Sequence, residues 1–322
     1  MKKLHKIGFV LGCFLMLIQF SNYSLVAQIT NAKPDSLFDP SLYDPEIINT
    51  AYPKNNGPNI HLDEGHNNRH TFGGLGSFIA FRNVLSKDGY KVISFKDQFT
   101  TTSLQNVRLL VIPCAQNEKN LEPRWFNPTY SAFKLSEIIA IKNWVKKGGS
   151  LFLIVDHHPF AGAAKKLAKE FGFELYNGHA QSMDTIRYQV YFHRADKTLS
   201  SNVITNGRDV TERIDSIITF HGSAMKLPDD ASPIITFDDS WLQWLPDTAW
   251  DFNNIEPESI SGFSQGAFMK FGKGKVVIFT DANMFSAQET DWGGSMGFID
   301  PKAKYNYKLL LNIVHYLDGL LN

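Results

Sequence analysis

Cysteine is scarce in this chain, with two among 322 residues. Cys13 lies in an apolar stretch near the start, and Cys114 lies in the middle of the chain. If the start is removed as argued below, one thiol remains, and a disulfide within the mature chain is excluded. A hydrophobic core must therefore stabilise the fold.

An excess of charge of either sign is also absent. Lys and Arg total 32, and Asp and Glu total 32. A chain without a basic excess lacks the electrostatic footprint of proteins that bind nucleic acid or anionic lipid. We therefore expect a small-molecule or glycan ligand and no nucleic acid, with a protein partner as a further candidate.

Long apolar runs are confined to the start of the chain. Basic residues precede Ile7–Phe20, which is too short to span a bilayer comfortably, and Ala27 offers a cleavage point. This pattern predicts a signal peptide over 1–27 and an exported protein that is periplasmic, cell-surface or secreted. The alternative is a lipoprotein leader cleaved at Val10–Cys13, which would leave half of the apolar run on the mature chain. No membrane span is expected after cleavage, because no later stretch offers about 20 apolar residues.

The organisation of the mature chain follows from its periodicity. Residues 28–57 are rich in Asn, Asp, Pro and Ser and predict an extended arm. Over 58–322, apolar runs alternate with amphipathic ones, which predicts strands joined by helical crossovers. We therefore expect an α/β domain with a doubly wound, mostly parallel, flavodoxin-like sheet. Residues from about 176 to 262 break this rhythm and predict an inserted irregular cap.

Two segments carry the fold prediction most clearly. Leu135–Lys147 has apolar residues at helical spacing, and Gly148 and Gly149 follow where a helix would end. Leu151–Val155 is apolar throughout, as a central parallel strand covered on both faces requires.

Polar residues follow three of the predicted strands and one strand-like piece of the insertion. Because parallel strands place their carboxyl ends along one edge of a sheet, these residues are expected to be neighbours. The candidate catalytic residues are Asp63, His66, Asp156, His157, His221 and Asp281. The candidate substrate-binding residues are Asn68, His70, Asn283, Trp241 and Trp244.

Three chemical roles are open for these groups. A His paired with Asp can act as a general base toward water. His66, His157 and Asp156 could instead hold a divalent metal such as zinc, although their spacing matches no metal motif. The structural alternative is that each Asp caps a helix and each His is a hydrogen-bonded structural residue.

Other features have a structural and a functional interpretation. Trp241 and Trp244, with Trp250 and Phe252, could stack on sugar rings or form a small satellite core. Cys114 could be a nucleophile, but a buried inert thiol is the simpler interpretation.

Familiar nucleotide and hydrolase motifs are missing. Gly73–Ser77 lacks the third glycine of a dinucleotide fingerprint and is not followed by Gly-Lys-Ser/Thr. No Gly-x-Ser-x-Gly elbow occurs either.

Four segments resemble the class I glutamine amidotransferase-like superfamily, specifically its branch of uncharacterised exported domains. They are Asp63–Asn67, Gly89–Val92, Trp144–Leu151 leading to Asp156-His157, and Gly272–Val277 leading to Asp281. The resemblance covers roughly Asn59 to Leu175 and Gly266 to Leu321. It implies the fold and not a chemistry, and similar domains bind partners in gliding, transport and intraflagellar transport machineries.

The sequence departs from the enzymes of that superfamily at one position. They carry a nucleophilic Cys after the strand that corresponds to Leu151–Val155, where this chain has Asp156, His157 and His158. Glutamine hydrolysis is therefore not expected. The leading hypothesis is an exported hydrolase acting on a carbohydrate or another envelope-accessible small molecule. The alternatives are a non-catalytic glycan- or protein-binding module and a degenerate enzyme retained as a scaffold.

Overall fold

The structure is a computed structural model that describes residues 39–73, 77–183, 190–290 and 294–321. The predicted signal peptide and the first part of the predicted arm lie outside these residues, as does Cys13. Residues from Asp39 onward form one compact unit, and all that follows concerns that unit.

A central sheet organises the unit. Its strands lie in the order β2 (Lys91–Phe95), β1 (Asn59–Asp63), β3 (Leu109–Pro113), β4 (Ser150–Ile154), β14 (Gly274–Phe279), β13 (Ser264–Phe271), β9 (Met225–Lys226) and β5 (Glu174–Leu175). β10 (Ser232–Thr236) also pairs with β13. The strands from β2 to β14 are parallel, and β13 is antiparallel to β14. The predicted α/β architecture with a mostly parallel sheet is confirmed.

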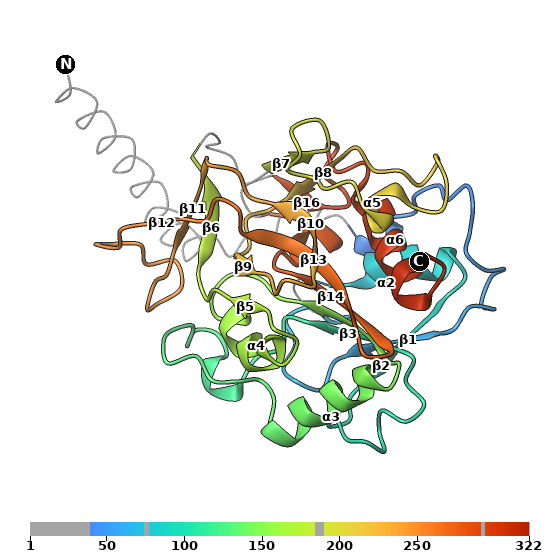
Figure 1. Cartoon of the computed structure of the whole chain (residues 1–322), viewed down its shortest axis with the longest axis horizontal. Coiled ribbons are helices and arrows are strands. Elements are labelled where there is room, and N and C mark those ends of the chain that lie inside the picture. Colours follow the sequence, from blue (N-terminus) through green and yellow to red (C-terminus); the bar gives the residue numbers. More distant parts are fainter. Residues whose placement is uncertain (1–38, 74–76, 184–189, 291–293, 322) are drawn as a thin grey trace. The chain divides into compact units, whose positions relative to one another are not determined.

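Helices cover both faces of the parallel strands (Figure 1). They are α2 (Ile79–Lys87) and α6 (Asn306–Asp318) on one face, and α3 (Leu135–Lys146) and α4 (Phe160–Lys169) on the other. The central strands β3 and β4 are buried along their whole length, as their predominantly apolar sequences predict. An ion pair of 2.7 Å between Lys142 and Glu170 ties α3 to α4.

The segment from 176 to 262 contains short strands where the sequence predicted an irregular cap. β6 (His179–Ser182), β11 (Trp241–Trp244) and β12 (Glu258–Ser259) form one small sheet, and β7 (Val190–His193) pairs with β8 (Ser216–Thr219). A short α5 (Val203–Asn206) lies between them, and β9 and β10 extend the central sheet. The insertion is therefore continuous with the domain through hydrogen-bonded strands.

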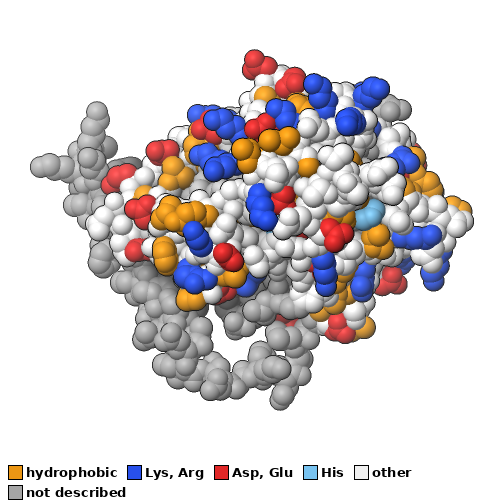
Figure 2. Space-filling view, turned by 90° about the horizontal axis from the view of Figure 1, so that it is seen from below, with side chains coloured by type: hydrophobic (Ala, Val, Ile, Leu, Met, Phe, Trp, Pro, Cys, Tyr) orange, Lys and Arg blue, Asp and Glu red, His pale blue; other side chains and the backbone are white. Residues whose placement is uncertain are grey.

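Small elements complete the described chain. They are the 3₁₀ turns η1 (Pro40–Leu42), η2 (Glu118–Asn120) and η3 (Asn283–Phe285), and the strand pair β15 (Ala287–Glu289) and β16 (Ser295–Gly297). No helix among the described residues is long and apolar enough to cross a membrane. Figure 2 shows basic and acidic side chains interspersed over the face that it presents, in line with the balanced composition.

Candidate functional site

Four side chains from different strand ends meet at the carboxyl edge of the sheet. Cys114 follows β3, Asp156 lies just beyond β4, Asp281 lies just beyond β14, and His70 lies between β1 and α2. One ligand atom each of His70, Cys114 and Asp156 lies within 4.8 Å of the others, and all three side chains are buried. The Asp281 carboxyl is close enough that its charge acts on Cys114 and that the charge of Asp156 acts on Asp281 itself. We call these four residues the strand-end centre.

Hydrogen bonds hold the two carboxyls of this centre in place. Asp156 accepts from the backbone N–H of His157 (2.7 Å) and of Ala282 (3.2 Å), and from the Asn283 side-chain amide (3.3 Å). Asp281 accepts from the N–H of Phe220 (2.6 Å) and of Asn283 (3.0 Å). Asn283 therefore positions both carboxyls.

Burial changes the acidity of the centre. It raises the pKa of Asp156, and it raises the pKa of Asp281 with the charge of Asp156 adding to the effect. Burial, followed by the two carboxylates, also raises the pKa of the Cys114 thiol. Buried neighbouring acids resist ionising together, so the centre retains protons at a pH where exposed carboxyls are charged.

His157 presents an imidazole nitrogen above the centre. Its Nδ1 donates to the backbone carbonyl of His158 across 2.6 Å, which fixes the tautomer and leaves the lone pair on Nε2. Nε2 lies 4.0 Å from Asp156 Oδ1. Burial lowers the pKa of His157 to about 4, so the ring is neutral at pH 7.

Aromatic rings surround this imidazole. The ring centroid of His157 lies 4.4 Å from that of Trp250, 5.8 Å from that of Trp125 and 5.5 Å from that of Phe160. The Trp250 side chain is 45% exposed, so the rings reach solvent. We call Trp125 and Trp250 the tryptophan wall. The Arg69 guanidinium lies 5.7 Å from the Trp125 ring and adds a cation beside it.

The insertion supplies two more imidazoles. His221 follows β8 and meets His179 of β6 edge-to-face, with centroids 4.8 Å apart, and His179 in turn contacts Trp250 at 5.1 Å. Burial lowers the pKa of His179 well below its usual value, and the nearby His221 and His157 add to this. Neither the position of His179 nor its contacts is signalled by the sequence around it.

A glycine explains how closely the insertion approaches the sheet. Gly222 has φ +74°, and a Cβ at this position would lie 2.0 Å from the backbone oxygen of Thr280, at the end of β14. The neighbouring Ser223 N–H donates to the same oxygen across 2.8 Å. Only glycine permits this approach, which brings His221 to the edge of the centre.

His66, Asp63 and Asn68 form a separate network beside the centre. His66 Nδ1 lies 2.9 Å from Asp63 Oδ1, and its Nε2 lies 3.0 Å from Oε1 of Glu137 in α3. Asn68 accepts from the His66 N–H and donates to Asp63 and to the Pro113 carbonyl. Burial alone would lower the pKa of His66, but the two carboxylates outweigh it and raise the pKa. Both nitrogens are therefore engaged, which indicates a structural network.

The predicted tryptophans fall in different surroundings. Trp241 is 2% exposed and packs on Phe192 and Phe237, which makes it part of a satellite core. Trp244 pairs with His179 across β11 and β6 and contacts Phe252. Trp250, between β11 and β12, is the tryptophan of the insertion whose ring touches His157.

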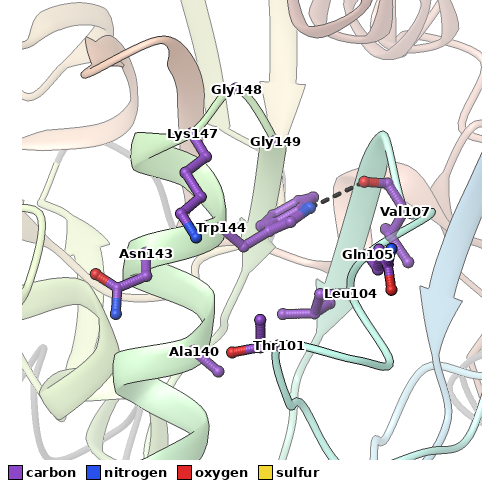
Figure 3. Close-up of a pocket in the computed structure, with 10 residues that line it drawn as sticks. All are labelled: Thr101, Leu104, Gln105, Val107, Ala140, Asn143, Trp144, Lys147, Gly148 and Gly149. Atoms are coloured by element: carbon purple, nitrogen blue, oxygen red, sulfur yellow. Dashed lines mark hydrogen bonds between the residues drawn. The ribbon is translucent and has the colours of Figure 1, made fainter.

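A hollow lies at the opposite end of the strands from the strand-end centre. It has a volume of about 370 Å³ and is bounded by α3, the Gly148–Gly149 turn before β4 and the loop before β3 (Figure 3). The Trp144 indole donates to the Val107 carbonyl across 2.9 Å and lies against Gly149. Lys147 is the one ionisable side chain among the residues that line it, so the lining of this pocket contains no carboxylate or imidazole.

No protein-family model matches the sequence, and no curated protein matches it. Among solved structures, the mmIFT52 N-terminal domain superposes with a TM-score of 0.53 at 14% identity, over 80% of this chain and 96% of that one. A ThuA-like protein from Bacteroides uniformis gives a TM-score of 0.45 at 10% identity, over 85% and 94% of the two chains. A protein from Thermoplasma acidophilum described as part of a GMP synthase gives 0.42 at 11% identity, over 81% and 94%. At 14% identity, the likeness to the mmIFT52 N-terminal domain bears on the fold alone.

Proposed function

We propose that the protein is a hydrolase for a carbohydrate or another small polar molecule, with His157 as its general base. The observation that carries this proposal is the bond of 2.6 Å from His157 Nδ1 to the His158 carbonyl. It leaves Nε2 unprotonated between Asp156 and the tryptophan wall. A neutral imidazole with a bare Nε2 can accept a proton at neutral pH, and an ionised Asp156 beside it would favour the protonated ring that forms.

In the proposed mechanism, His157 Nε2 accepts a proton from a water molecule as the water oxygen attacks the substrate carbon. The bond from that carbon to the leaving oxygen breaks, and the imidazolium returns the proton to the leaving oxygen. The imidazolium formed would be stabilised by the ionised form of Asp156, whose pKa burial raises to about 7 and whose Oδ1 lies 4.0 Å away. Asn283 holds Asp156 through its amide hydrogen bond, and Asp281 is the neighbouring carboxyl on which the charge of Asp156 acts, so neither group is assigned a contact with the substrate. His66 takes no part as a base, because carboxylates occupy both of its nitrogens.

The surroundings of His157 support a carbohydrate as substrate. Sugar rings present apolar C–H faces that pack on aromatic rings, while their hydroxyl groups need hydrogen-bond partners. Trp250 offers an exposed ring, and Arg69 offers donors beside Trp125. The predicted signal peptide adds the proposal that the substrate is met outside the inner membrane, where envelope and environmental glycans are accessible.

A turnover screen of the full chain tests the function. The probes are 4-nitrophenyl glycosides and 4-nitrophenyl acetate, assayed with the wild type, His157→Ala and the control His193→Ala. His193 lies on β7 against Tyr191, outside the proposed site. We expect hydrolysis of at least one probe, lowered about 10²–10⁴-fold in His157→Ala and unchanged in His193→Ala. Equal rates in the two variants, or no hydrolysis of any probe, would contradict the proposal.

A non-catalytic glycan- or protein-binding module is the second candidate. Exposed apolar side chains on the loops beside the tryptophan wall favour it: Phe126 (45% exposed), Tyr130 (42%), Leu245 (39%) and Trp250 (45%). The two loops are joined, because Ala249 N–H donates to the Trp125 carbonyl across 2.8 Å. Calorimetric titration with cellotetraose and maltotetraose separates the candidates, since binding without hydrolysis of the oligosaccharide indicates a binding module.

A further inference from the structure

We infer that His70, Cys114 and Asp156 form a zinc site at the carboxyl edge of the sheet, with the fourth coordination position open to a ligand. The site overlaps the proposed active site, but the inference does not depend on catalysis, because metal binding is measured without a substrate. The ligand set differs from the one expected from the sequence, which contained His66 and His157 instead of His70 and Cys114.

The geometry is close to what zinc needs. The three ligand atoms lie within 4.8 Å of one another. Zinc bonds of about 2.0–2.3 Å in a tetrahedron place ligand atoms roughly 3.3–3.8 Å apart. Binding one zinc ion to all three ligand atoms therefore requires side-chain movements of about 1 Å. Among the described residues, no other group of three or more His, Cys, Asp and Glu side chains brings its ligand atoms this close together.

Charge gives an independent reason for a cation at this point. Cys114, Asp156 and Asp281 are acidic side chains buried together at one edge of the sheet. The hydrogen-bond donors to Asp156 are two backbone N–H groups and a side-chain amide, all of them neutral. Buried carboxylates are costly unless they are paired with a cation or coordinate a metal, and a divalent ion would meet that need.

The donor atoms select the metal. Calcium and magnesium prefer oxygen ligands throughout, whereas one nitrogen, one sulfur and one oxygen suit zinc. Coordination converts the Cys114 thiol to a thiolate and releases its proton to solvent. Three protein ligands leave one position for water or a substrate oxygen, as in catalytic zinc sites. Asn283, whose amide holds Asp156, would be the outer partner that orients this ligand.

Cobalt spectroscopy of the full chain tests the inference directly. The protein carries Cys13→Ser, so that Cys114 is its single thiol, and is stripped with a chelator before Co²⁺ is added. We expect one Co²⁺ per chain, a near-ultraviolet thiolate-to-cobalt charge-transfer band, and loss of that band when zinc is added. Failure to bind either ion would overturn the site, and so would binding without the thiolate band, since that places the ion elsewhere.

Matched variants assign the ligands. Cys114→Ser, His70→Gln and Asp156→Asn should each weaken zinc binding beyond the roughly 10–100-fold that loss of an outer partner costs, with His193→Gln as the control. Circular dichroism shows whether each variant folds. If a variant does not fold, the wild-type protein still tests the site. One equivalent of zinc should raise the unfolding temperature of the wild type, and an unchanged temperature would contradict the site. Zinc binding without turnover would support this site and contradict the proposed function. Turnover in a chain that binds no zinc would support the proposed function and contradict this site.

Discussion

His66 and Glu137 form a buried ion pair of 3.0 Å that joins the loop after β1 to the first turn of α3, across 71 positions of the chain. The same Glu137 carboxylate accepts the Lys134 N–H across 2.9 Å and so caps the helix. The second nitrogen of His66 meets Asp63 at 2.9 Å, and its ring stacks on Phe99. These contacts hold in place the loop after β1, which carries His70 to the strand-end centre.

His66→Ala should lower the free energy of unfolding, because His66 belongs to a structural network. Removing the imidazolium leaves Asp63 and Glu137 buried without their shared partner, and breaking such a pair costs about 3–5 kcal/mol. Urea denaturation of the variant measures this loss. His193→Ala, on the partly exposed β7, should stay within about 0.5 kcal/mol of the wild type. A His66→Ala protein as stable as the wild type would show that the network contributes little.

Unfolding free energy should fall as the pH rises above about 6.5. His66 and His315 both have raised pKa values, because carboxylates outweigh the opposing effect of burial: Asp63 and Glu137 for His66, and Asp88 and Glu212 for His315. A group with a raised folded-state pKa stabilises the fold below its unfolded pKa, and this stability is lost as the pH rises through the folded value.

Other titrating groups do not reverse this sign. Burial raises the pKa of Asp156 and Asp281, so they also favour folding more at lower pH. Burial lowers the pKa of His157 and His158 to about 4 and also lowers the pKa of His179 and His61, so these rings act in the opposite direction, mainly below about 6.5. Urea denaturation with a chelator present, at about pH 6.5 and about pH 8.5, measures the slope. A stability that increases over this interval would contradict the assigned charges, and His315→Gln should flatten the decrease.

Two glycines with similar backbones test how closely the insertion packs on the sheet. Gly222 and Gly262 have φ +74° and +80°, but a Cβ would clash with Thr280 at Gly222 and meet nothing within 4 Å at Gly262. Both alanine variants should lose about 1–3 kcal/mol through backbone strain. Gly222→Ala should lose clearly more, because Thr280 or the loop that carries His221 must move. Thermal and urea unfolding compare the two, and equal losses would mean that the close approach is not needed.

Two tryptophans of the insertion should separate binding from stability. Trp241→Ala empties a buried position and should cost about 3–5 kcal/mol of stability. Trp250→Ala removes a half-exposed ring from His157 and should cost about 1 kcal/mol. Its affinity for an oligosaccharide ligand should fall at least tenfold, a loss of about 1.4 kcal/mol in binding free energy. Calorimetry that finds unchanged affinity would exclude the tryptophan wall as a binding surface.

The architecture could be predicted because its signals are local. The apolar run of Leu151–Val155 becomes the fully buried β4, and the helical spacing of Leu135–Lys147 becomes α3, one residue shorter. Because the carboxyl ends of parallel strands share one edge of a sheet, the sequence also predicted that Asp156 and Asp281 lie together. Both carboxyls also accept backbone N–H groups, which is the structural role that the sequence left open for them.

The finer geometry of the site could not be predicted, because its contacts join distant segments. Glu137 has the sequence signature of a helix cap, and nothing near it indicates His66. In the sequence alone, Cys114 has the features of an inert buried thiol. In the structure, the loop after β1 lies against it, and the Arg69 N–H donates to the Cys114 carbonyl across 3.0 Å. That fold places His70 beside the thiol.

The protonation state of His157 tests the proposed function most directly. Long-range ¹H–¹⁵N correlation spectra of the metal-free full chain, with the signals of this ring assigned through His157→Gln, report which ring nitrogen carries a proton. The structure predicts a neutral ring at pH 7, protonated at Nδ1 toward the His158 carbonyl and bare at Nε2. A ring protonated at Nε2, or an imidazolium, would contradict a base at this position.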